Sequence, residues 1–192
     1  MIAAASLQIS EFAAINRSGL RDEDGDAEDW IEIKNTSDVN SDLAGWHLSD
    51  DRENLRKWPL PAVIMASGEI RLVIASGKDR RNVEGPWHAN FKLSGAGEFL
   101  ALSDPEGVII DAFDPNYPAQ VADLSYGRDD TGAFRYWQSP TPGQRNVTDL
   151  SDRPLLLPVD LDSAVPMAEE NVDLTVSVRA FPGAHAVEAV RC

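Results

Sequence analysis

Acidic side chains gather in one short stretch near the start of the chain. Residues 22–29 read Asp-Glu-Asp-Gly-Asp-Ala-Glu-Asp, with no basic side chain among them. Carboxylate oxygens are the ligands that Ca²⁺ prefers, and alternating aspartates are common in calcium-binding loops. Carboxylates placed side by side also repel one another unless a cation neutralises them. The sequence therefore predicts a calcium site whose ligands are Asp22, Asp24, Asp26, Glu28 and Asp29.

A calcium loop of the EF-hand type does not fit this stretch. If Asp22 is the first ligand, Gly25 falls at position 4 instead of 6, and Ile33 takes position 12, where a bidentate glutamate belongs. The alternative is an acidic hairpin loop without metal, in which Asp24-Gly25 forms the turn. A calcium site of another geometry and a loop without metal both stay open at this point.

The motifs of known catalytic sites are missing from the sequence. The histidines, His47, His88 and His185, are too far apart for the i, i+4 pair of a zinc-protease helix. The chain has no G-x-S-x-G or S-x-x-K motif and no complete phosphate-binding glycine loop. We expect a non-catalytic protein with no cofactor other than the calcium ion considered above, and we expect His88 to form local hydrogen bonds.

The overall composition disfavours several further classes of protein. The formal net charge is −15 and the sequence pI is about 4.4, which argues against binding to nucleic acid or to anionic lipid. No apolar run reaches the length of a membrane span, so we expect no membrane insertion. Cys192 is the only cysteine, which permits neither an internal disulfide nor a cysteine-based zinc site. The five tryptophans are expected in the core rather than on a sugar-stacking surface.

Short apolar segments that alternate with polar residues are typical of β-strands. Turn signals such as Asp24-Gly25 and Thr131-Gly132 separate them, and no long stretch has helical periodicity. Many short strands with regular punctuation predict a β-sandwich or barrel. The expected strands cover residues 7–12, 30–34, 43–48, 70–74, 99–102, 108–113, 124–127 and 134–137.

A domain boundary is expected soon after residue 140, where the sequence becomes rich in proline and polar residues. Beyond it, Val172, Leu174, Val176 and Val178 alternate with polar residues, as in a half-buried strand. The few strands that fit into 149–192 are too few to close an independent core. We therefore expect one complete domain over 1–148, with its core at about 7–146. We expect 149–192 to hold a linker and the first strands of a second, incomplete β-sandwich, so that the chain is a fragment of a longer protein.

The order of motifs along the chain is similar to that of a known family. The matching pieces are Ile9-Ser10-Glu11-Phe12, Asp29-Trp30-Ile31-Glu32-Ile33-Lys34-Asn35, Leu43-Ala44-Gly45-Trp46-His47-Leu48, Lys57-Trp58-Pro59-Leu60-Pro61, Ser125-Tyr126-Gly127-Arg128 and Pro140-Thr141-Pro142-Gly143. The ordered set runs from about Leu7 to Asn146 and resembles the lamin tail domain, most closely its bacterial branch. The second segment loosely resembles the start of an Ig-like or fibronectin-type module.

This resemblance implies an all-β, Ig-like β-sandwich without catalytic activity. In such a sandwich we expect Glu32 to tie a neighbouring loop through its carboxylate and Pro142-Gly143 to end the last strand. The resemblance further implies an interaction or adhesion module of a larger secreted or cell-surface protein, with a protein or an extracellular polymer as partner. The alternatives are a Ca²⁺-dependent carbohydrate- or polymer-binding module, and an accessory domain of an enzyme whose catalytic part lies outside this chain.

Overall fold

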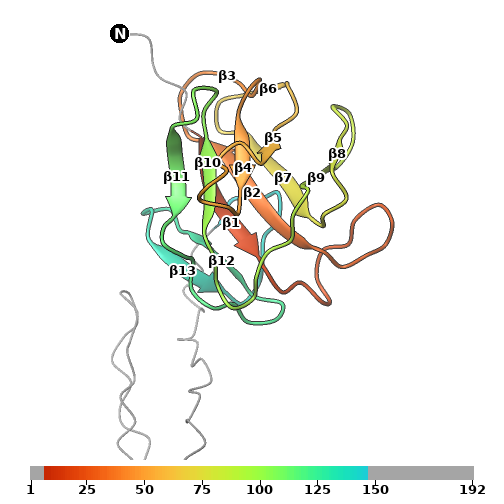
Figure 1. Cartoon of the computed structure of the whole chain (residues 1–192). Helices are drawn as coiled ribbons and strands as arrows, with labels where there is room; N and C mark the ends of the chain where they lie inside the picture. The colour runs from red at the N-terminus through yellow and green to blue at the C-terminus, as the bar shows by residue number, and fades with distance from the viewer. Residues whose placement is uncertain (1–6, 147–192) are drawn as a thin grey trace, which may run out of the picture. The chain divides into compact units, whose positions relative to one another are not determined.

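The structure is a computed structural model that describes residues 7–146 of the chain. These residues form strands and connecting loops without a helix, as Figure 1 shows. They therefore contain no helix that is long and apolar enough to cross a membrane. The second, incomplete β-sandwich expected over 149–192 lies outside the described residues.

The larger of the two main sheets has seven strands in the order β13-β12-β1-β2-β7-β9-β8. All neighbours in it are antiparallel except β7 and β9, which are parallel. The sheet consists of β1 (Leu7–Ala13), β2 (Asp29–Asn35), β7 (Ile70–Ala75), β8 (Arg80–Arg81), β9 (Trp87–His88), β12 (Ser125–Arg128) and β13 (Phe134–Trp137).

The second main sheet has four antiparallel strands in the order β11-β10-β4-β5. It consists of β4 (His47–Ser49), β5 (Trp58–Pro59), β10 (Leu100–Ser103) and β11 (Ile109–Phe113). A small ribbon pairs β3 (Ser41–Asp42) with β6 (Ile64–Met65). The two main sheets enclose one large apolar core to which both contribute side chains. This arrangement confirms the expected β-sandwich.

Alternation along β2 sets which side chains enter this core. Ile31 and Ile33 are fully buried within it, while Glu32 and Lys34 point to the opposite face of the sheet because successive side chains of a strand alternate. All five tryptophans are buried, at 5% exposure or less, which confirms their expected place in the interior. No tryptophan face is therefore available on the surface for stacking against a sugar ring.

One expected strand begins later than its sequence pattern indicated. The segment 43–48 was expected to be extended, but β4 starts only at His47. The Trp46 amide donates to the Leu43 carbonyl, which closes a turn. Gly45 takes a left-handed φ of 80° there, and a Cβ at this position would lie 3.0 Å from the Cβ of Pro105. The turn places the Trp46 indole in the core, and the first residues of the expected strand belong to the turn instead.

Candidate functional site

The acidic loop, defined as residues 21–28, forms the second part of the connection between β1 and β2. It curls around Asp22, whose Oδ1 accepts hydrogen bonds from the backbone amides of Asp24 and Asp26 at 3.0 and 2.9 Å. The Gly25 amide donates to the Asp22 carbonyl, and Gly25 takes a left-handed φ of 86°. Asp24 and Gly25 thus lie in the turn, as the sequence predicted, but its two central residues are Glu23 and Asp24.

Three carboxylates of the acidic loop converge on one ammonium group. The Nζ of Lys78 lies 2.6 Å from Asp22 Oδ2, 2.7 Å from Asp24 Oδ2 and 2.9 Å from Asp26 Oδ2. Lys78 follows β7, so the cation comes from a segment more than 50 residues away in sequence. The carboxylates that were expected to surround Ca²⁺ therefore surround a positive charge that the chain itself supplies.

The pKa values of this cluster follow from these contacts. Hydrogen bonds from Arg80 and then Lys78 lower the pKa of Asp24 to about 2. Desolvation acts to raise the pKa of Asp22, but the hydrogen bonds from Lys78 and from the loop amides outweigh it, so that pKa is also lowered. The contacts to Asp22, Asp24 and Asp26 raise the pKa of Lys78. Asp22, Asp24 and Lys78 are therefore charged at neutral pH.

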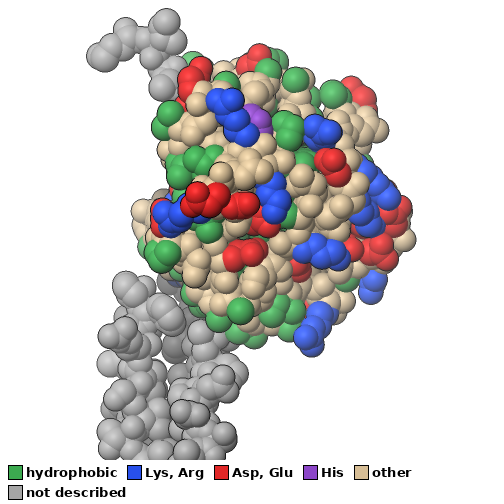
Figure 2. Space-filling view, in the orientation of Figure 1, with side chains coloured by type: hydrophobic (Ala, Val, Ile, Leu, Met, Phe, Trp, Pro, Cys, Tyr) green, Lys and Arg blue, Asp and Glu red, His purple; other side chains and the backbone are tan. Residues whose placement is uncertain are grey.

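A second set of contacts fastens the acidic loop to β8 and β9. Glu23 accepts from the Arg80 guanidinium at 2.7 Å and lies 2.9 Å from Nε2 of the fully buried His88. On the other side of the ring, His88 Nδ1 lies 2.8 Å from Ser76 Oγ. Since the carboxylate can only accept, Nε2 donates to Glu23, while Nδ1 and the Ser76 hydroxyl form the hydrogen bond on the other side of the ring. At the right margin of Figure 2, red and blue side chains interleave where this loop lies.

Hydrogen bonds link the side chains of Ser76, His88 and Glu23 in the same order as in a Ser-His-acid catalytic triad. Their surroundings, however, do not suit catalysis. Ser76 is only 5% exposed. The amides of Gly77 and Asp79 donate to the carbonyls of Phe91 and Ala89, so neither is available to stabilise an oxyanion. The arrangement is a buried polar network that holds the loop against the sheet.

The structure brings together three of the five predicted calcium ligands. Glu28 instead pairs with Lys92 at 2.7 Å, and Asp29 Oδ1 accepts from the Asn16 amide at 3.3 Å. A second group that the sequence did not indicate combines Asp22 and Glu23 with His88, with ligand atoms within 4.8 Å of one another. Calcium binding by the acidic loop stays a prediction.

A different cluster of carboxylates lies buried on the outer face of the larger sheet. Glu11 and Glu32 are register partners on β1 and β2, and both are at most 1% exposed. Burial is the main cause that raises the pKa of Glu11, and burial together with the charge of Glu11 raises the pKa of Glu32 to about 7. Ser10 Oγ donates to Glu32 at 2.5 Å, and Ser125 Oγ donates to Glu11.

These two glutamates hold the last described segment of the chain. Thr141 donates to Glu11 from its hydroxyl at 3.0 Å, and the Gly143 amide donates to Glu32 Oε2 at 2.9 Å. Asn146 is buried beside them, and its amide donates to the Arg128 carbonyl at 3.0 Å. The contact of Gly143 confirms that Glu32 ties a neighbouring loop. The last described strand, however, ends at Trp137, before Pro142-Gly143.

Exposed apolar side chains gather on another edge of the sandwich. We call Val108, Ile109, Ile110 and Phe134 the apolar edge patch; they are 56%, 39%, 39% and 38% exposed. Three belong to β11 or the residue before it, and Phe134 reaches β11 through ring contact with Phe113 at 5.0 Å. Green side chains lie along the left margin of Figure 2, over the position of β11 in Figure 1. Exposed apolar side chains at a sheet edge are candidates for contact with a partner.

The fold defines a class, the Ig-like β-sandwich. The family model described as Lamin Tail Domain matches residues 2–116 of the chain. The chain belongs to the lamin tail domain family, as its motifs indicated, and this family consists of typically non-catalytic, Ig-like interaction domains. A search of curated proteins gives no match.

Proposed function

We propose that this domain is a non-catalytic interaction module of a larger secreted or cell-surface protein. The observation that carries the proposal is the apolar edge patch, which holds Val108, Ile109, Ile110 and Phe134, four of the seven large apolar side chains exposed among residues 7–146. Apolar surface at a sheet edge is stabilised when a partner covers it, by about 25 cal/mol for each Å² removed from water. The partner therefore contacts this edge.

The edge suits side-chain docking better than the addition of a strand. Ile110 is the extra residue of a bulge, since Leu102 pairs with Asp111 and Ser103 with Ile109. Asp111 turns its carboxylate away from this edge and accepts from the Ile9 amide at 2.8 Å. Bulges and inward-pointing charges discourage strand-to-strand pairing. The partner is thus held by its side chains against the apolar edge patch.

The net negative charge of the chain indicates which kind of partner surface it would attract. A second copy carries the same formal charge of −15 and is repelled at long range. One exposed acid, Glu106, lies in the turn directly before Val108 and β11. We infer that the partner is a protein with an apolar contact surface surrounded by lysine or arginine side chains.

Photo-crosslinking on intact cells tests this proposal. A photo-reactive residue at Ile110 is expected to capture one partner protein, while the same residue at Val83, which is 51% exposed on the turn between β8 and β9, is not. Protease added to intact cells is expected to digest the chain. Equal capture from both positions, or a crosslinked homodimer, would contradict the assigned surface, and protection from protease would contradict the location.

A second candidate function is Ca²⁺-dependent binding of a carbohydrate or polymer. The convergence of Asp22, Asp24 and Asp26 supports it, while the ammonium of Lys78 between them opposes it. Calorimetric titration of Ca²⁺ into the chelator-treated chain, beside an Asp22→Ala/Asp24→Ala/Asp26→Ala variant, separates the two candidates. Heat released only by the chain with intact aspartates would favour the calcium-dependent function.

A further inference from the structure

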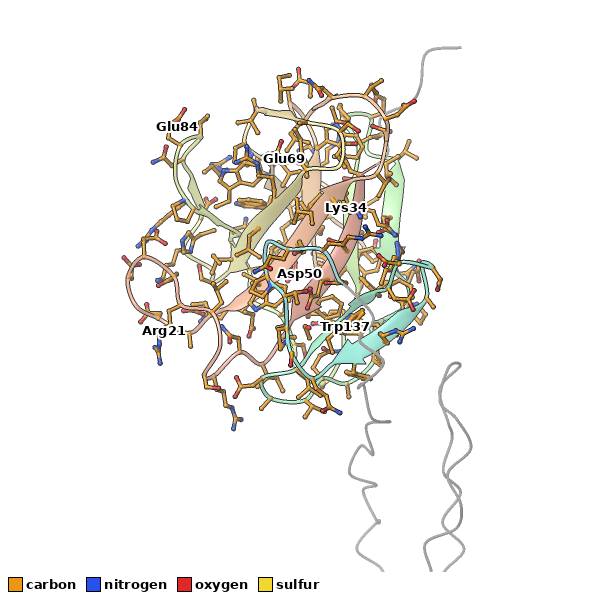
Figure 3. All side chains as sticks on the ribbon, turned by 180° about the vertical axis from the view of Figure 1, so that it is seen from behind. Arg21, Lys34, Asp50, Glu69, Glu84 and Trp137 are labelled. Atoms are coloured by element: carbon orange, nitrogen blue, oxygen red, sulfur yellow. The ribbon has the colours of Figure 1, made fainter. Side chains whose placement is uncertain are left out.

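A hollow of about 290 Å³ lies on the outer face of β1 and β2. Its floor and walls include Ser10, Glu32, Lys34, Arg128, Arg145 and Asn146. The segment that follows Trp137 crosses this face of the sheet, as Figure 3 shows, and its Arg145 and Asn146 border the hollow. The volume is near the lower end of the range for small-molecule sites.

Most charges that border the hollow are neutralised by other side chains of the domain. Arg128 pairs with Asp111 at 2.7 Å, and Arg145 pairs with Asp130 at 2.8 Å. The bordering Asp129 pairs with Arg135. These pairs leave the hollow without a strong charge from any of its arginines or aspartates.

Lys34 is the exception among the cations of the hollow. Its ammonium forms no hydrogen bond or ion pair with any side chain between residues 7 and 146. The nearest carboxyl on the same strand face is Glu32, whose raised pKa of about 7 leaves it partly protonated at neutral pH. The hollow therefore has a spare positive charge within a chain that is otherwise strongly acidic.

We propose that this hollow binds a small organic anion through one carboxylate group, which pairs with the Lys34 ammonium. Glu32, on the same strand face, borders the hollow beside Lys34. A single uncommitted cation matches a monoanionic carboxylate better than a dianionic phosphate, because the second phosphate charge would have no partner. This site goes beyond the proposed function, since its ligand is a small molecule and it is separate from the apolar edge patch.

The groups that face Glu32 determine the expected pH dependence. Glu11 on β1 raises the pKa of Glu32, and Lys34 on β2 lowers it. The other charged groups that border the hollow are paired with side chains of the domain; they are Arg128, Asp129, Asp130 and Arg145. Ionisation of Glu32 above its pKa would add a negative charge beside the bound carboxylate. Binding is therefore expected to weaken between pH 6 and 8.

Nuclear magnetic resonance titrations of the full chain with glucuronate and with glucose test the proposal, because the two probes differ at the carboxylate. Glucuronate is expected to shift the amide signals of residues 32–34 and 129–132 with a dissociation constant in the millimolar range. Acetate is expected to shift the same signals. Glucose is expected to leave them unchanged. Absence of saturable shifts with both carboxylates, or equal binding of glucose, would overturn the proposal.

Two lysine variants provide the matched control. Lys34→Gln is expected to weaken glucuronate binding about tenfold, since charged hydrogen bonds contribute about 1.5–3 kcal/mol. Lys92→Gln removes an equal charge from the Glu28 ion pair, outside the hollow, and is expected to leave binding unchanged. Equal weakening by both variants would show general charge attraction instead of a site. Because the crosslinking at Ile110 does not involve Lys34, either proposal can fail alone.

Discussion

The Gly143 amide donates a 2.9 Å hydrogen bond to Oε2 of Glu32, across 111 residues of sequence. Ser10 occupies the other oxygen of the same carboxylate at 2.5 Å. One buried side chain in the second strand therefore fastens the last described segment to the outer face of the sheet. The same segment borders the hollow around Lys34, so this contact contributes both to the stability of the domain and to the shape of the site.

Removal of this carboxylate is expected to destabilise the domain. Glu32→Ala leaves the Gly143 amide and the Ser10 hydroxyl without their acceptor, and a buried donor that loses its partner costs about 1–3 kcal/mol. Tryptophan fluorescence during urea unfolding measures the loss, because all five tryptophans lie in the described domain. Glu84→Ala, on the exposed turn after β8, is the control and is expected to stay within about 0.5 kcal/mol of the parent. Equal effects of the two variants would contradict the fastening role.

The pH dependence of stability follows from the raised pKa of Glu32. Its folded pKa of about 7 lies above the ordinary value of 4.5, so the folded state retains a proton that the unfolded state has released. The contribution of this group is fully favourable below the unfolded pKa and is lost as pH rises from about 4.5 to 7, on the order of 1–3 kcal/mol. Urea unfolding at several pH values is expected to show this fall.

Glu32→Gln isolates the contribution of that group, because other buried acids such as Asp29 and Asp111 also have raised pKa values. The glutamine variant is expected to lose less stability than the parent between pH 4.5 and 7. The lowered pKa of Asp24 acts in a separate window and removes stability as pH falls below about 4. Parallel pH profiles of parent and variant would contradict the raised pKa.

The alternation of apolar residues predicted the sandwich well, because it reports local burial. Ile31 and Ile33 face the core, and Glu32 faces the other side, as their spacing indicated. The partners of the polar side chains could not be derived in this way. Lys78 joins Asp22 from 56 positions away, and His88 joins Glu23 from 65 positions away. Such pairs depend on which loops the topology brings together, and that information is spread over the whole chain.

Substitution of Lys78 tests whether the acidic loop is neutralised by the chain or by metal. Lys78→Met leaves Asp22, Asp24 and Asp26 facing one another without their shared cation. The variant is therefore expected to have a lower Tm than the parent in chelator. Because the three carboxylates lie within reach of one ion, added Ca²⁺ is expected to restore part of that loss.

The parent chain and a second lysine variant are the controls. In the parent chain the ammonium occupies the position between the carboxylates, so Ca²⁺ is expected to leave its Tm unchanged. Lys92→Met removes the partner of Glu28 alone and is expected to respond to neither chelator nor Ca²⁺. A rise in the Tm of the parent with Ca²⁺ would show that metal displaces Lys78, and would favour the calcium-dependent candidate function.

The affinity for the partner captured at Ile110 tests the central claim most directly. With the purified partner and the full chain, Ile110→Asp is expected to weaken binding by about tenfold or more, because it places a charge in an apolar contact. Val83→Asp adds the same charge at an exposed position on another loop and is expected to leave the dissociation constant unchanged. Unchanged affinity of Ile110→Asp, or an equal loss in both variants, would contradict the assignment of the apolar edge patch as the interaction surface.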